Sequence, residues 1–269
     1  MNHLIYILFG IAPSLIWLSF YLRKDVNPEP KKMILKVFSL GIGAGIIAIF
    51  IETFAKNFVL NYFPIRLITS RTFNQVAILA WGAALIEEFS KYISVQKKYF
   101  VAKNGILSDA ECDEPLDLML YMIVAALGFA ALENVLKLYS ENLLLVEAFM
   151  ISSFRFIGAV LLHALCSGTL GFFIAISFFK SQKKIYFVLL GLSIATLLHG
   201  AFNYSIIKIE ESLAVINQSL VISNPILFFL SVITLLITLF GLGLFVSLGF
   251  EKLKGMANVC RINPKYRKT

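Results

Sequence analysis

The sequence predicts an all-α membrane protein, a polytopic bundle of about seven transmembrane helices joined by short connections. Of its 269 residues, 59% are hydrophobic and 15% are charged, whereas soluble domains average about 45–50% apolar and about 25% charged residues. This composition excludes a water-soluble enzyme. Because one span needs about 20 helical residues, the chain holds about seven spans and has no room for a separate extramembrane domain.

Seven stretches of 15 residues or more contain no Asp, Glu, Lys or Arg, and each marks one predicted span. We predict a single membrane domain over 1–251 and a basic cytoplasmic tail over 252–269. The predicted spans are 3–22, 34–54, 74–96, 117–138, 155–179, 185–207 and 225–249. The first run lacks the basic start and the cleavage site of a secretory signal, so we keep it as a span.

The last uncharged run, 212–250, is too long for one span, and polar residues and Pro225 interrupt its first half. We therefore expect an interfacial or re-entrant piece near 212–224, which would give eight membrane segments if it counts as one.

The second predicted span carries a packing motif. The spacing of Gly41 and Gly45 is the G-x-x-x-G pattern that allows two membrane helices to approach closely.

The basic residues predict the orientation. Eighteen of the 24 Lys and Arg residues lie in four segments, 23–36, 91–103, 180–184 and 252–268. Cytoplasmic loops retain an excess of Lys and Arg, so the N-terminus is predicted outside and the C-terminus in the cytoplasm. The same distribution argues against a nucleic-acid partner, because such proteins gather their basic residues on one solvated face.

Function is sought in the ionisable residues that remain inside spans despite the energetic cost. The third span carries Glu87 and Glu88 with Lys91 one turn later, and the fourth carries Glu133. Each has a plainer interpretation, because Lys91 can pair with either acid and Glu133 is spaced to pair with Lys137. One lysine beside two adjacent carboxylates nevertheless leaves a surplus negative charge.

The fifth and sixth spans add two histidines. His163 lies within 24 residues free of formal charge, and His199 shares a helix face with Asn203. A single membrane histidine is often only an interhelical hydrogen-bonding residue, but two beside three carboxylates suit hydrolysis. A carboxylate can take a proton from water, imidazoles with a carboxylate can bind zinc, and the Asn203 amide can stabilise an oxyanion.

These residues resemble the PrsW-type intramembrane proteases, which are related to the CAAX-processing and bacteriocin-processing membrane proteases. The resemblance rests on Glu87-Glu88-x-x-Lys91, Phe129-x-x-x-Glu133-Asn134, His163 followed by Gly168 and Gly171, His199-Gly-x-Phe-Asn203, and Asp25-x-Asn-Pro28-Glu29-Pro30. In the CAAX-type relatives a histidine stands where this chain has Glu133. The resemblance implies a protease of the bacterial cytoplasmic membrane that cleaves a membrane-tethered anti-sigma factor in a site-1-type step.

We therefore expect Glu87 or Glu88 to act as the base, Lys91 to hold one carboxylate charged, and Asn203 to stabilise the oxyanion. His163, His199 and Glu133 are the expected ligands of a zinc ion. A glutamate-type enzyme without a metal stays open, as does the choice between the two acids. Two alternatives outside this class are an ion-coupled transporter, since buried acids and histidines also form proton relays, and a non-catalytic relative with the same fold.

Overall fold

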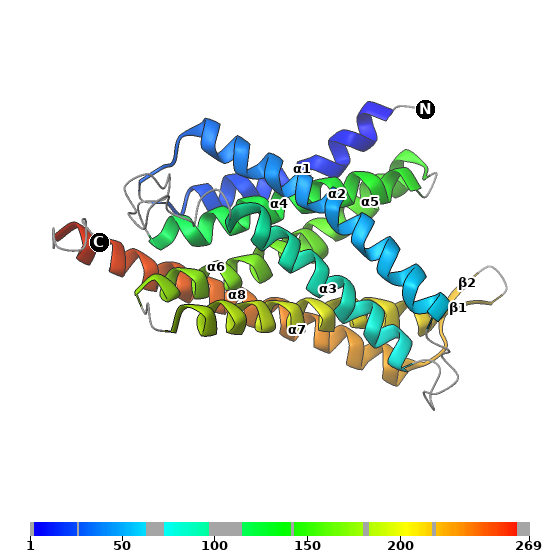
Figure 1. Ribbon diagram of the computed structural model, residues 1–269. Helices are drawn as coiled ribbons and strands as arrows, with labels where there is room; N and C mark the ends of the chain where they lie inside the picture. The colour runs from blue at the N-terminus through cyan, green and yellow to red at the C-terminus, as the bar shows by residue number, and fades with distance from the viewer. Residues whose placement is uncertain are drawn as a thin grey trace.

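The computed structural model describes residues 3–25, 27–62, 73–96, 115–140, 143–179, 183–216 and 219–262. The described chain forms seven helical rods, which run back and forth along one axis and leave the two termini at opposite ends of the bundle (Figure 1). The helices are α1 (His3–Leu22), α2 (Lys31–Tyr62), α3 (Phe73–Val95), α4 (Pro115–Ser140), α5 (Leu145–Arg155), α6 (Leu161–Phe179), α7 (Lys184–Glu211) and α8 (Pro225–Ile262). A π-helical segment, Phe156–Val160, joins α5 and α6 into one rod.

Six of these rods are long and apolar enough to cross a membrane, which confirms the predicted polytopic helical bundle. The predicted third span, α3, is not among the six, and it is the helix that carries Glu87, Glu88 and Lys91. The N-terminus outside and the C-terminus in the cytoplasm stay predictions. They agree with the positions of the two termini at opposite ends of the bundle (Figure 1).

The segment near 212–224, which was expected to be an interfacial or re-entrant piece, forms a β-hairpin. Strands β1 (Leu213–Ile216) and β2 (Ser219–Ile222) pair antiparallel, and valine and isoleucine favour this extended conformation. Ser223 closes the base of the hairpin, because its backbone N–H and its hydroxyl both donate to the carbonyl of Ser212. At the other end of α8 the helix continues to Ile262, well into the predicted tail, of which 263–269 lies outside the described residues.

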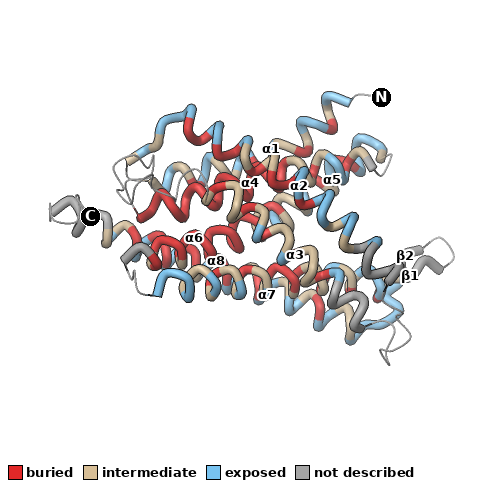
Figure 2. Tube along the Cα trace, in the orientation of Figure 1, coloured by how far each residue is buried: buried red, intermediate tan, exposed pale blue. Residues whose placement is uncertain are grey.

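Helix α4 is the centre of the bundle and packs against α1, α2 and α6 (Figure 2). The approach of α2 to α4 depends on glycine. A Cβ on Gly41 would lie 1.9 Å from the carbonyl oxygen of Ala125, and one on Gly128 would lie 2.0 Å from that of Phe38. The expected packing role of the Gly41–Gly45 pattern is seen here, since a Cβ on Gly45 would also meet Leu132 at 2.9 Å.

Two glycines of the same helix should respond differently to substitution. Gly41→Ala places a methyl group against the α4 backbone, and such overpacking costs about 1–3 kcal/mol of unfolding free energy. Gly43→Ala is the matched control, because nothing lies within 4 Å of its added Cβ. We expect thermal unfolding in detergent to show a lower melting temperature for Gly41→Ala alone. Equal effects of the two variants would contradict this packing.

Candidate active site

The site is built around the two adjacent acids of α3 and the lysine one turn later. Lys91 Nζ lies 2.7 Å from Glu88 Oε1 and 3.7 Å from Glu87 Oε2, the i,i+3 and i,i+4 pairs that a helix brings together. The Lys91 side chain is fully buried, and its ammonium also lies 4.3 Å from the centre of the Phe129 ring. The lysine therefore sits between both acids, under an aromatic face of α4.

Glu88 is fully buried and has partners on both of its oxygens. Its Oε1 accepts from Lys91 and from His199 Nδ1 at 2.9 Å, and its Oε2 accepts from the Ser167 hydroxyl at 2.8 Å. Because an ionised carboxylate only accepts hydrogen bonds, His199 carries its proton on Nδ1. In the neutral ring, Nε2 then carries the lone pair and faces Glu87 Oε2 at 3.7 Å. Glu88 thus connects α3 to α6 and α7 by hydrogen bonds and orients the imidazole of His199.

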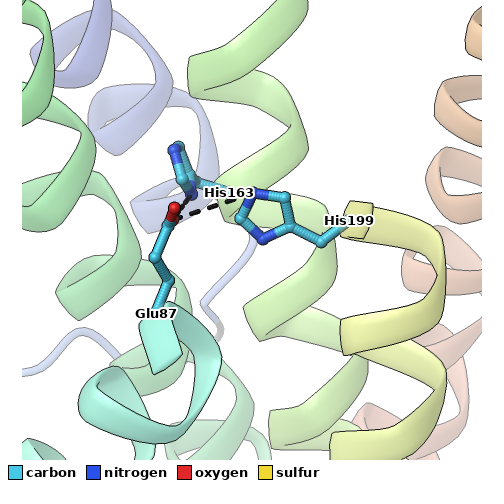
Figure 3. A group of neighbouring side chains, drawn as sticks. All are labelled: Glu87, His163 and His199. Carbon is cyan, nitrogen blue, oxygen red and sulfur yellow. Dashed lines mark ion pairs between the residues drawn. The ribbon is translucent and has the colours of Figure 1, made fainter. Parts of the chain in front are cut away.

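Glu87 differs from its neighbour in having an oxygen without a hydrogen bond. Its Oε2 is buried and has no hydrogen-bond partner among the described residues, and its side chain is 12% exposed. This oxygen lies 3.7 Å from His163 Nδ1 and 3.7 Å from His199 Nε2, so that an acid and two imidazoles from three helices face one another (Figure 3). Glu87 is therefore the acid at the centre of the cluster.

His163 is held from both sides. Its Nε2 lies 2.7 Å from Glu133 Oε2, and its Nδ1 lies 2.8 Å from Lys91 Nζ. Since the carboxylate accepts and the ammonium donates, the proton of the neutral ring is on Nε2. Glu133 in turn accepts from Arg155 Nη2 at 2.6 Å through its other oxygen. Glu133 thus contacts the outer nitrogen of His163 and an arginine, and it does not belong to the group at the centre.

The side-chain atoms of Glu87, His163 and His199 fit a small metal ion. One ligand atom from each residue lies within 4.8 Å of the other two. Bonds of about 2.0–2.1 Å to zinc make the edge of a coordination tetrahedron about 3.4 Å long, which is close to the 3.7 Å that separates Glu87 Oε2 from either imidazole. Lys91 at present uses the lone pair of His163 Nδ1, so His163 can bind an ion only after the lysine has moved away from it.

A glycine allows α3 and α7 to approach closely beside the site. A Cβ on Gly200 would lie 2.3 Å from Cδ1 of Trp81, and the Trp81 indole donates to the carbonyl of Leu197 at 3.1 Å. This close crossing places His199, the residue before Gly200, against the acids of α3. The glycine of the His199-Gly-x-Phe-Asn203 pattern is thereby explained by packing.

The structure thus brings together Glu87, Glu88, Lys91, Glu133, His163 and His199, all predicted as site residues. Asn203 lies one turn beyond His199 on α7, half-buried, and donates no hydrogen bond within the described part of the chain. Its expected role as an oxyanion donor stays a prediction.

Three residues of the site were not predicted. Ser167 donates to Glu88, Arg155 donates to Glu133, and Glu52 of α2 interacts electrostatically with Glu87, Glu133 and Lys91. Ser167 could have been found, because it stands one helical turn after His163. Arg155 and Glu52 lie at the edges of uncharged runs, where charge is ordinarily attributed to loops.

Comparison with known proteins gives a consistent result. Residues 29–239 match the family model described as "PrsW family intramembrane metalloprotease". Protease PrsW of Geobacillus kaustophilus is 30% identical over 215 residues, which cover 75% of this chain and 80% of that protein. Protease PrsW of Bacillus subtilis is 28% identical over 198 residues, covering 72% and 79%. No solved structure shows significant similarity to this chain.

Proposed function

Because the chain belongs to the PrsW family of intramembrane metalloproteases and is thus a membrane protease, we propose that Glu87, His163 and His199 form its catalytic centre. The observation that carries this proposal is Oε2 of Glu87, which forms no hydrogen bond with any described residue and faces one nitrogen of each histidine at 3.7 Å. A buried carboxylate oxygen without a hydrogen bond is costly. Its place between two imidazoles suggests that a water molecule or an ion belongs there.

The residues that would hold a zinc ion are His163 and His199, with Glu87 completing a set of three. When bound there, zinc would supply a Lewis acid that polarises the scissile carbonyl and acidifies the attacking water. Glu88 and Glu133 would each hold one imidazole in the required orientation, as carboxylates commonly do for histidine ligands. This set replaces Glu133 of the predicted ligands by Glu87.

The proton transfers are assigned to Glu87, through its Oε1 where Oε2 would hold an ion. As the oxygen of water attacks the carbonyl carbon of the peptide bond, its proton passes to Glu87 and then to the leaving amine nitrogen. Glu88 is a poor candidate for this base, because Lys91, His199 and Ser167 already occupy its oxygens. Lys91 keeps Glu88 ionised by direct contact in a site shielded from water. Without a metal, the two imidazoles would orient the same water molecule.

The proposed substrate is a membrane-tethered protein of the anti-sigma factor type, cleaved at a peptide bond that reaches the bundle interior. This choice follows from the resemblance to the PrsW-type proteases. A single-span protein suits a site that lies among helices, and the Glu133 side chain, which contacts His163, is 39% exposed at the edge of this site.

The test is cleavage in a defined membrane. The purified protein is reconstituted in liposomes with a single-span anti-sigma factor carrying a different tag at each end, and the products are analysed by mass spectrometry. We expect one cut in the substrate, and none with the His199→Ala variant, which should still insert. Ion flux across the liposomes without cleavage of any single-span substrate would contradict the protease and support the transporter alternative.

A further inference from the structure

Arg155 stands outside the catalytic centre but is connected to it through one residue. Its Nη2 donates to Glu133 Oε1 at 2.6 Å, and Glu133 Oε2 lies 2.7 Å from His163 Nε2. Its Nε donates to the side-chain oxygen of Asn134, whose amide nitrogen lies 3.3 Å from the carbonyl oxygen of Gly10 in α1. Arg155 thereby fixes the carboxylate that meets His163 and anchors it to the first helix.

The π segment explains how Arg155 and His163 reach the same carboxylate. They are eight residues apart in one rod, and eight residues of α-helix make about 2.2 turns, which would point the two side chains in different directions. A π turn takes in one additional residue, so the separation becomes close to two whole turns. The segment Phe156–Val160 lies between the two residues and brings both side chains onto Glu133.

The π segment is itself held in place by α1. The Trp17 indole donates to the carbonyl of Phe156, the first residue of the segment, at 2.8 Å, and the two rings stack with their centres 5.3 Å apart. The irregular turn is therefore fixed at its beginning. Single π turns of this kind are frequent at functional sites.

From this geometry we infer that Arg155, brought into phase by the π segment, is a positioning residue that helps the Lys91 ammonium to keep the His163 proton on Nε2, with Nδ1 facing Glu87. Glu133 accepts the hydrogen bond from the Nε2–H of His163 only while its carboxylate keeps its orientation, and the contact with Arg155 fixes that orientation. This inference rests on the proposed function, because it supposes that Nδ1 of His163 works at the centre. Loss of such an outer contact typically costs about 10–100-fold in activity or metal affinity.

The test reads the tautomer directly, on metal-free protein without substrate. The chain has three histidines, so ¹⁵N-histidine labelling in a His3→Gln background leaves two rings to assign by long-range ¹H–¹⁵N correlation. We expect the Nε2–H form of His163 in the parent protein and a mixture of forms in Arg155→Gln. Arg155→Lys can restore the contact with Glu133 but not the second one to Asn134, and should lie between the two.

Two further variants separate this inference from its alternatives. Deleting Ile157, which is 63% exposed, removes the additional residue of the π segment and leaves a separation of seven residues, about 1.9 turns of α-helix, between Arg155 and His163. Both side chains then still face Glu133, so the tautomer should stay as in the parent protein, and a changed tautomer would contradict the phase argument. Lys137→Gln is the matched control, since Lys137 is exposed one turn from Glu133. The Lys137→Gln variant should alter the tautomer only if Lys137, and not Arg155, fixes the orientation of the Glu133 carboxylate.

The activity of the same variants completes the test. For Arg155→Gln we expect kcat to fall about 10–100-fold with KM unchanged. An unaltered tautomer in both Arg155→Gln and Arg155→Lys would overturn the positioning role and leave the protease assignment intact. Full cleavage by a His163→Ala variant would instead remove the proposed function, whatever tautomer the parent protein shows.

Discussion

Replacing Glu87 by glutamine should abolish cleavage and leave the stability of the fold unchanged. The same change at Glu88 should abolish cleavage and also lower the stability of the fold. Glu87 Oε2 has no hydrogen-bond partner among the described residues, so replacing Glu87 breaks no hydrogen bond of that oxygen and only its 3.7 Å ion pair with Lys91 is weakened. We expect kcat to fall by about 10²–10⁴-fold, the usual contribution of a general base. The apparent melting temperature in detergent should stay close to that of the parent protein.

Glu88→Gln should behave differently because Glu88 and Lys91 are both fully buried and 2.7 Å apart. Removing one partner of a buried ion pair leaves an uncompensated charge and costs about 3–5 kcal/mol. We expect a clearly lower melting temperature together with loss of cleavage. Activity assays on membranes and thermal unfolding of the purified variants measure the two effects separately.

A matched control for both variants is Glu251→Gln on α8. Its side chain is 74% exposed and pairs with Lys254 at 3.4 Å, so the same chemical change is made away from the site. This variant should retain both activity and stability. If Glu87→Gln unfolds as readily as Glu88→Gln, or if it still cleaves, the assignment of Glu87 as the acid at the centre is wrong.

Removing the metal should stop the reaction, and restoring zinc should recover it. The purified protein is expected to contain one zinc ion per chain by elemental analysis and to lose cleavage after treatment with a strong chelator. His199→Ala and Glu87→Ala should each purify with far less zinc, because one ligand of three is absent.

Ser94→Ala serves as the control for metal content, because its hydroxyl donates to the Lys91 carbonyl and does not contact the cluster of acids and imidazoles. It should retain the zinc of the parent protein. Full cleavage by a chelator-treated protein that contains no zinc would exclude the metal-dependent version and favour the glutamate-type alternative, in which the imidazoles hold only water.

Much of the fold could be predicted from the positions of charge alone. An uncharged run of sufficient length has few other structures available to it in a bilayer. Helix ends were less predictable: α2 continues to Tyr62, beyond the expected end at 54, because a helix need not stop where the bilayer does. The hairpin at 213–222 was expected only as an interfacial or re-entrant piece, because its strands are short and apolar and resemble the flanking helices in composition.

Most residues of the site could also be predicted from the sequence, but which of their side chains contact one another could not. Adjacent residues such as Glu87 and Glu88 point about 100° apart on a helix, and only the positions of α6 and α7 decide which of them is saturated with hydrogen bonds. The connection from Arg155 to His163 was hidden for another reason. The 3.6-residue rule assigns the two residues to different faces, and the π segment that aligns them has no signature in the sequence.

The position of Glu52 on α2 has a consequence for electroneutrality. With Glu52 included, the interior of the bundle gathers four carboxylates, from Glu52, Glu87, Glu88 and Glu133, around two basic side chains, Lys91 and Arg155. The carboxylates outnumber the basic side chains, and their mutual repulsion is strong in a medium that screens charge poorly. A divalent cation at the centre would relieve this repulsion.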